Sequence, residues 1–110
     1  MQNVYDLAHE LARSLKETDQ YKDYSRLREE ISANESVDKM IKDFQEKSMA
    51  LQSQTMMGQE PDEESMKQFQ SLYSIIMSDP LAGKYLGAEL AFTQIISELY
   101  TIIGEAAKVD

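Results

Sequence analysis

Residues 81–103 read LAGKYLGAELAFTQIISELYTII and form the last long apolar segment of the chain. Apolar side chains recur in this segment at alternating spacings of four and three residues. This stripe, here called the seam, consists of Leu81, Tyr85, Ala88, Phe92, Ile95, Leu99 and Ile102. Such spacing is typical of a helix that packs lengthwise against other helices. The seam therefore predicts a long helix around which the rest of the chain is organised.

The N-terminal half of the chain carries signals for three more helices. Asn3 is a suitable N-cap for an amphipathic helix, whose apolar face loses its phase near Thr18. We expect this helix to break or kink there and a second helix to begin. A third helix is expected after a junction at Asn34. It is predicted to end at Met57, because Gly58 suits the left-handed backbone position that follows a helix.

The segment after Gly58 predicts a loop and a fourth helix. Pro61 is interpreted as the first residue of that helix, since its fixed φ suits the first helical position. Asp79 precedes a proline and is therefore disfavoured in the α region, which ends the fourth helix. Pro80 then opens the final helix. The C-terminal half thus contributes two helices.

These patterns predict an all-α fold, a four- to five-helix bundle with long antiparallel helices and no strands. A chain of 110 residues is expected to form a single helical domain, residues 1–110. We expect the third and fifth helices to be long antiparallel members of its core.

Composition excludes several functional classes. The chain has no cysteine, which excludes disulfides and thiolate metal sites. Its N-terminus lacks the basic start of a signal peptide, and no segment has the roughly 18 consecutive apolar residues of a membrane span. A net charge of −9 repels phosphate backbones and disfavours direct nucleic-acid binding. We therefore predict an acidic, cytoplasmic protein.

An ordered set of short motifs along the chain resembles the YheA-like proteins of Gram-positive bacteria, which are relatives of the YlbF/YmcA regulators. The matching residues are Val4-Tyr5-Asp6, Ala8-x-x-Leu11, Tyr21, Phe44, Met57-Gly58-Gln59-Glu60-Pro61, Pro80-Leu81, Tyr85-Leu86-x-Ala88-Glu89, Phe92 and Ile102-Ile103-Gly104-Glu105. The resemblance implies an all-helical oligomer, commonly a homodimer, without established enzymatic activity. The YlbF/YmcA branch is implicated in competence, sporulation, biofilm control and RNA processing, through assemblies of family members. Its cysteine-held iron–sulfur clusters cannot be carried over to a cysteine-free chain.

Candidate catalytic and metal-binding residues are few. His9 follows Asp6 at the spacing of a carboxylate–histidine metal pair, but a di-iron bundle needs two such pairs and the chain has one histidine. Glu89 and Glu98 project to opposite sides of the last helix, so they cannot act together as an acid–base pair. We expect Glu89 to flank the seam near a cation or a tyrosine hydroxyl and Glu98 to face solvent. We therefore predict no catalytic residues, no cofactor-binding residues and no metal site.

Apolar side chains outside the seam predict an interface. Leu86, Leu90 and Tyr100 lie on the other side of the last helix, so that helix is expected to be covered on both sides. The adjacent Met56 and Met57 diverge by about 100° and are not expected to share one buried face. The full set of candidate interface residues is Leu86, Leu90, Phe92, Ile96, Tyr100, Met56 and Met57.

The functional hypothesis is a non-enzymatic oligomerising protein, a homodimer in its simplest form, that acts through protein–protein contacts as a regulatory adaptor. Its partners would be a second copy, other family members or regulatory proteins. Two alternatives remain open: an accessory role in RNA processing or in competence and sporulation control, and a small-molecule or metal-binding module.

Overall fold

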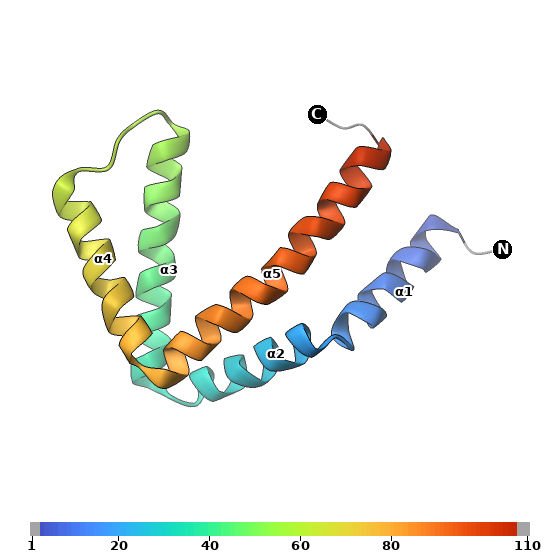
Figure 1. Ribbon diagram of the computed structural model, residues 1–110, viewed down its shortest axis with the longest axis horizontal. Coiled ribbons are helices and arrows are strands. Elements are labelled where there is room, and N and C mark those ends of the chain that lie inside the picture. The colour runs from blue at the N-terminus through green and yellow to red at the C-terminus, as the bar shows by residue number, and fades with distance from the viewer. Residues whose placement is uncertain (1–2, 108–110) are drawn as a thin grey trace. The chain divides into compact units, whose positions relative to one another are not determined.

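The computed structural model describes residues 3–107 as five helices joined by short connections (Figure 1). The helices are α1 (Val4–Lys16), α2 (Asp19–Ser32), α3 (Glu35–Met56), α4 (Glu63–Ser78) and α5 (Pro80–Ala107). No strand is present in this part of the chain. The predicted all-α fold is therefore confirmed.

The described residues divide into two compact units. Unit 1 comprises residues 3–28 and 85–107, and unit 2 comprises residues 29–84. Helices α2 and α5 run from one unit into the other. The single domain of residues 1–110 stays a prediction.

Side-chain caps set the beginnings of α1 and α3, and the sequence predicted the first of these caps, Asn3. The Asn3 carboxamide oxygen accepts a hydrogen bond from the Asp6 backbone N–H at 2.9 Å, and Asn34 accepts one from Val37 at 3.2 Å. Each bond satisfies a backbone donor that has no partner within its own helix.

Thr18 makes the break between α1 and α2. Its hydroxyl donates to the Leu15 carbonyl at 2.7 Å and accepts from the Tyr21 N–H at 3.1 Å. One side chain thus closes the end of α1 and caps the start of α2, which confirms the predicted break.

Gly58 ends α3 through a pair of backbone hydrogen bonds. The N–H of Gln59 donates to the carbonyl of Gln54 at 2.9 Å, and that of Gly58 donates to Thr55 at 3.1 Å. This pattern requires a left-handed residue, and Gly58 has φ +80°. The predicted stop is confirmed, with the last helical residue at Met56 rather than Met57.

The prediction that Pro61 begins the fourth helix was wrong. Helix α4 begins at Glu63, and Asp62 is its N-cap, with a side-chain oxygen 2.7 Å from the Ser65 N–H. That hydrogen bond holds the pKa of Asp62 below its usual 3.8. An aspartate cap satisfies a backbone donor, which proline at the first helical position does not do, so the cap decides where the helix begins.

The connection between α4 and α5 matches the prediction. Asp79 has extended backbone geometry, and its side chain accepts from the Ala82 N–H at 3.0 Å. Pro80 therefore occupies the first position of a capped helix. The 28 residues of α5 make it the longest helix among those described.

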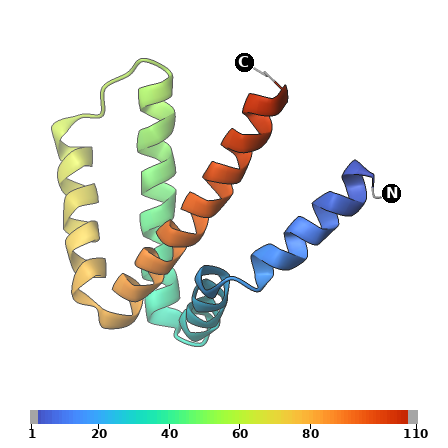
Figure 2. The same cartoon turned by 45° about the vertical axis from the view of Figure 1, so that its right-hand side comes forward.

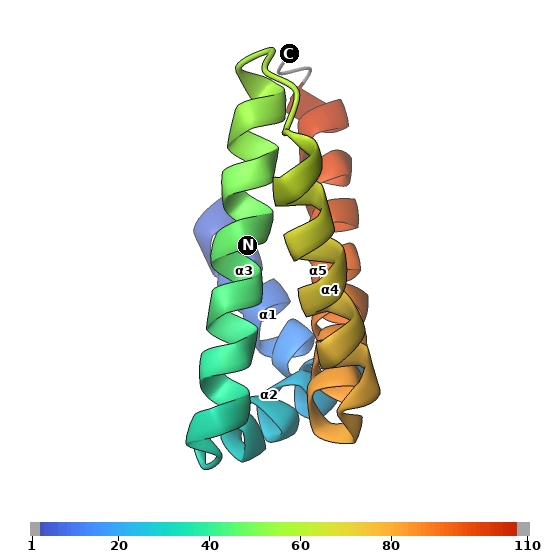
Figure 3. The same ribbon diagram turned by 90° about the vertical axis from the view of Figure 1, so that its left-hand side faces the viewer.

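In unit 2, α3 and α4 form an antiparallel pair that lies side by side in every view (Figures 1–3). Phe44 stacks on Phe69 with ring centroids 5.1 Å apart and lies 6.1 Å from Tyr73. Buried aliphatic residues complete this unit: Ile31, Val37, Ile41, Ile76 and Ala82. The pair confirms the predicted long antiparallel helices. The predicted antiparallel placement of α3 and α5 stays a prediction.

In unit 1, the aromatic residues of α2 pack on α5. Phe92 stacks on Tyr24 with ring centroids 5.2 Å apart and meets Tyr21 edge-on at 5.5 Å. Tyr24 also stacks on the buried Tyr85. This contact covers the N-terminal part of the seam, which was predicted to face other helices.

Candidate functional site

The outer side of α5 carries exposed apolar side chains. Leu90 and Tyr100 are 65% and 72% exposed, whereas Leu86 is half-buried. On the seam side of the same helix, Tyr85 is buried and Phe92 is half-buried. The sequence predicted cover on both sides of α5, but Leu90 and Tyr100 have little cover within the described chain, so cover of the outer side stays a prediction.

Two other candidate interface residues, Phe92 and Ile96, are half-buried in unit 1. Phe92 is engaged with the tyrosines of α2, as described above. Ile96 is half-buried and lines a shallow hollow of about 220 Å³ together with Leu99, Tyr100 and Ile103. The structure thus brings Ile96 and Tyr100 together and keeps Phe92 in the aromatic stack.

The C-terminal end of the seam is uncovered. Ile102 and the adjacent Ile103 are both exposed, although the sequence predicted a core-facing stripe over this whole length. The aromatic contacts from α2 end at Phe92. Beyond that residue, the seam keeps its spacing but has lost the aromatic cover of α2.

Helix α1 carries a second apolar face that was not among the candidate interface residues. Val4, Tyr5, Leu7 and Leu11 are all exposed, and α1 contains no buried residue. The signal for this surface is the stripe itself, which the sequence interpretation used only to define a helix. A stripe shows that a helix has an apolar face but not what covers that face.

Met56 and Met57 lie at the end of α3 and are 87% and 73% exposed. Met56 joins an open groove of about 580 Å³ in unit 2, which Met57 does not line. The residues around this groove are Ser48, Leu51, Gln52, Thr55, Met56, Pro61, Met66 and Phe69. Methionines on both helices make this a soft apolar surface.

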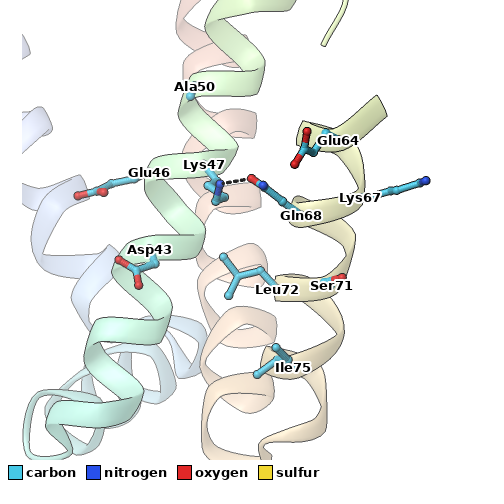
Figure 4. A pocket seen from close by; sticks show the side chains of 10 residues that line it. All are labelled: Asp43, Glu46, Lys47, Ala50, Glu64, Lys67, Gln68, Ser71, Leu72 and Ile75. Carbon is cyan, nitrogen blue, oxygen red and sulfur yellow. Dashed lines mark hydrogen bonds between the residues drawn. The ribbon is translucent and has the colours of Figure 1, made fainter. Parts of the chain in front are cut away.

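A larger open groove of about 730 Å³ runs between α3 and α4 (Figure 4). Lys47 of α3 donates a hydrogen bond to the side-chain oxygen of Gln68 at 2.9 Å, and this bond bridges the groove. Leu72 points toward α3 below the bridge, whereas Glu46 and Lys67 project away from it to either side. The groove therefore has a small apolar floor and charges of both signs on its flanks.

Tyr85 is a buried residue whose hydroxyl has a raised pKa. Burial raises the pKa of its hydroxyl, and hydrogen bonds with Glu89 and Tyr24 raise it further. The hydroxyl is thus protonated at neutral pH and acts as a hydrogen-bond donor. Glu89 lies next to a tyrosine hydroxyl and Glu98 is exposed, as the sequence predicted.

Other ionisable side chains offer no assembled centre within the part of the chain that the structure describes. His9 is exposed on α1. Among residues 3–107, no three histidine, aspartate or glutamate side chains are grouped closely enough to hold a metal ion. None of the described helices is long and apolar enough to cross a membrane. The prominent features are therefore apolar surfaces on helices.

Comparison with known proteins places this chain in a family. The family described as "Control of competence regulator ComK, YlbF/YmcA" matches residues 4–107. A UPF0342 protein of Symbiobacterium thermophilum is 38% identical over 107 residues, covering 97% of this chain and 96% of the relative. Another from Caldicellulosiruptor saccharolyticus is 36% identical over 106 residues, covering 96% and 88%.

A solved structure has the same fold. It is titled "Protein of Unknown Function (DUF964) from Bacillus stearothermophilus" and matches with a TM-score of 0.80 at 15% identity. The match covers 97% of this chain and 94% of that chain. From the family match and the relatives, the chain belongs to the YlbF/YmcA family.

Proposed function

We propose that this member of the YlbF/YmcA family is a non-enzymatic, cytoplasmic protein that self-associates through apolar helix faces. Its role is that of a regulatory adaptor, which brings protein partners together rather than transforming a substrate. The observation that carries the proposal is the pair of exposed side chains on the outer side of α5, Leu90 and Tyr100.

Physical chemistry supports an interface at this place. Leucine and tyrosine side chains along one side of a helix lose contact with water when a second apolar surface covers them. Each square ångström of apolar surface removed from water contributes about 25 cal/mol to the free energy of association. Tyrosine is also enriched in interfaces because its ring provides a large contact area. The net charge of −9 limits non-specific association of the remaining surface.

Light scattering of the purified protein tests self-association. We expect a dimer or larger species at tens of micromolar, in the range of moderate affinities. Leu90→Glu places a charge in the proposed interface and is expected to weaken association by at least about tenfold, which corresponds to 1.4 kcal/mol. Gln70→Glu adds the same charge at an exposed position of α4 and serves as the control.

Two results would count against self-association through α5. One is a strict monomer of the unaltered protein at these concentrations. The other is a Leu90→Glu variant that associates as strongly as Gln70→Glu. Circular dichroism of each variant checks that the helices are retained.

The family description favours one regulatory setting, the control of competence. We propose that the chain acts there through contacts with other proteins. Purified ComK or family members from the same bacterium, mixed with this protein, are expected to form a larger complex in light scattering. If every such mixture gives only the separate components, the setting in competence control is wrong, whereas self-association is unaffected.

A further inference from the structure

The groove of about 580 Å³ between α3 and α4, here called the methionine groove, lies wholly within unit 2. Its apolar lining consists of Leu51, Met56, Pro61, Met66 and Phe69. Phe69 stacks on Phe44 with ring centroids 5.1 Å apart, which holds this part of the lining in place. The Thr55 hydroxyl, also in the groove, donates to the Leu51 carbonyl at 3.0 Å, so its hydrogen bond is made within α3. The groove therefore offers mainly apolar contact.

Two exposed methionines make the groove adaptable. Met56 of α3 and Met66 of α4 both line it. A methionine side chain has three rotatable bonds and a polarisable sulfur, so it fits irregular apolar partners. Met49 and Met77 are exposed on the same two helices but do not line the groove. They therefore provide a matched comparison.

The length of the groove fits two turns of a helix. Its lining residues on α3 run from Ser48 to Met56, a span of about 12 Å at 1.5 Å per residue. Apolar side chains at positions i, i+4 and i+7 of an amphipathic helix span about 10.5 Å on one side. The groove is open, so an occupant keeps its outer side in water, whereas a small-molecule pocket encloses most of its ligand. A helix that is apolar on one side and polar on the other meets both conditions.

The charge of the loop beside the groove indicates the charge of the partner. From Ser48 to Met66 the chain has four acidic residues and neither lysine, arginine nor histidine. Glu60 and Asp62 flank Pro61, which lines the groove, and Glu63 follows. All three acidic residues are exposed. Complementary charge at this rim favours a basic partner.

The nearest lysines belong to the other groove between α3 and α4. Lys47 and Lys67 both line that groove, and Lys47 is hydrogen-bonded there to Gln68 at 2.9 Å (Figure 4). None of the residues that line the methionine groove is charged. The methionine groove thus has no cation in its lining that would repel a basic partner.

We propose that the methionine groove binds a basic amphipathic helix of a protein partner. The apolar side of that helix packs on Phe69 and the two methionines, and its lysines or arginines lie near Glu60 and Glu63. The groove is built from α3 and α4, whereas the proposed self-association uses α5. The proposal therefore adds a second binding surface to the proposed function.

A synthetic peptide tests this proposal. It has about 18 residues, because shorter helices are marginal in water. Leucines at three- and four-residue spacings and one tryptophan form its apolar side, and lysines form the other. The protein has no tryptophan, so indole fluorescence reports on the peptide alone. A scrambled peptide of the same composition has no apolar side and controls for unspecific attraction to a net charge of −9.

Two double variants locate the binding. Met56→Gln with Met66→Gln makes the groove polar with little change in side-chain length, and Met49→Gln with Met77→Gln makes the same change outside it. We expect a micromolar Kd for the unaltered protein and for the variant outside the groove. The groove variant is expected to bind at least about tenfold more weakly. Circular dichroism checks that both variants keep their helices.

Charge reversal tests the acidic loop. Glu60→Lys with Glu63→Lys is expected to weaken binding severalfold and to make it less dependent on salt. Asp43→Lys with Glu46→Lys changes the net charge equally, but these residues line the other groove. This control is expected to bind nearly as tightly as the unaltered protein. Equal weakening by the two double variants would overturn the role of the loop.

Other results would overturn the proposal as a whole. One is a scrambled peptide that binds as tightly as the amphipathic peptide. Another is a Met56–Met66 variant that binds as tightly as the Met49–Met77 variant. A Met56–Met66 variant that loses self-association in light scattering but keeps the peptide would show that a second copy covers the groove. A strict monomer that binds the peptide through the groove would instead contradict the proposed self-association alone.

Discussion

Helices α1 and α3 begin in the same way, but their apolar faces have different surroundings. Both follow an asparagine N-cap and both carry an apolar stripe. The face of α3 is packed, with Val37 and Ile41 buried, whereas α1 buries no residue. Local sequence signals therefore decide that a segment is helical, but packing decides whether its apolar face contributes to the stability of the single chain.

The largest expected effect on stability comes from comparing two adjacent isoleucines of α4. Ile76 is fully buried and Ile75 is 52% exposed. Ile76→Ala is expected to lower the free energy of unfolding by about 2–5 kcal/mol, because it removes apolar contacts and leaves a cavity. Ile75→Ala should cost much less in urea unfolding followed by circular dichroism. Equal losses for the two variants would show that the α3–α4 pair is not packed as described.

A matched pair of valines compares the two helices directly. Val37→Ala in α3 is expected to lower the free energy of unfolding by about 1.5–3 kcal/mol, because it removes two buried methyl groups and leaves a cavity. Val4→Ala in α1 should change stability by no more than about 0.5 kcal/mol in dilute solution, as exposed positions do. Unfolding is measured at low and high protein concentration. If Val4→Ala lowers the free energy of unfolding as much at low protein concentration as Val37→Ala does, the result would contradict an exposed Val4 in the single chain.

Two glycines are expected to respond with opposite signs. Gly58 has φ +80°, so Gly58→Ala strains the end of α3 and should destabilise the protein by about 1–2 kcal/mol. Gly87 lies within α5, and a Cβ added there would meet no atom within 4 Å, so Gly87→Ala should stabilise the protein by roughly 0.5–1 kcal/mol. Thermal unfolding measures both. A destabilising Gly87→Ala at high concentration alone would indicate that a second copy approaches α5 at this residue.

The smallest expected effect concerns the charge that caps α4. The folded-state pKa of Asp62 is lowered from 3.8, so its contribution to stability is present above that value and is lost as pH falls through the lowered pKa. Asp62→Asn should therefore be less stable than the unaltered protein near neutral pH, with a difference that shrinks below about pH 4. Glu64→Gln removes the same charge from the first turn and is the control. A pH-independent difference for Asp62→Asn would contradict this account of the cap.

Residues with local roles were predictable from the sequence. Asn34 and Gly58 act through hydrogen bonds to residues within five positions, so the sequence contains both partners. Pro61 was misplaced because two start signals compete there, and the hydrogen bond that the Ser65 N–H donates to the Asp62 side chain decides between them. Both signals stand in the sequence, but only the structure shows which residue begins the helix.

The candidate interface could be predicted only in part. Leu90 and Tyr100 were recognisable because they interrupt the polar side of α5 and are exposed in the structure. The face of α1 was not recognised, since Leu7 and Leu11 follow the same periodicity as residues that pack within one chain. Periodicity is a property of one helix, whereas cover depends on how distant segments meet.

Amide hydrogen exchange at two protein concentrations, one below and one above the association midpoint, tests most directly whether the chain self-associates through the outer side of α5. The exchange rates of the amides in α3 and α4 provide the internal reference. We predict that the amides of α5 between Leu90 and Tyr100 exchange more slowly in the dimer than in the monomer, while those of α3 and α4 stay equally protected in both. Amides between Leu90 and Tyr100 that exchange as rapidly in the dimer as in the monomer would contradict self-association through α5.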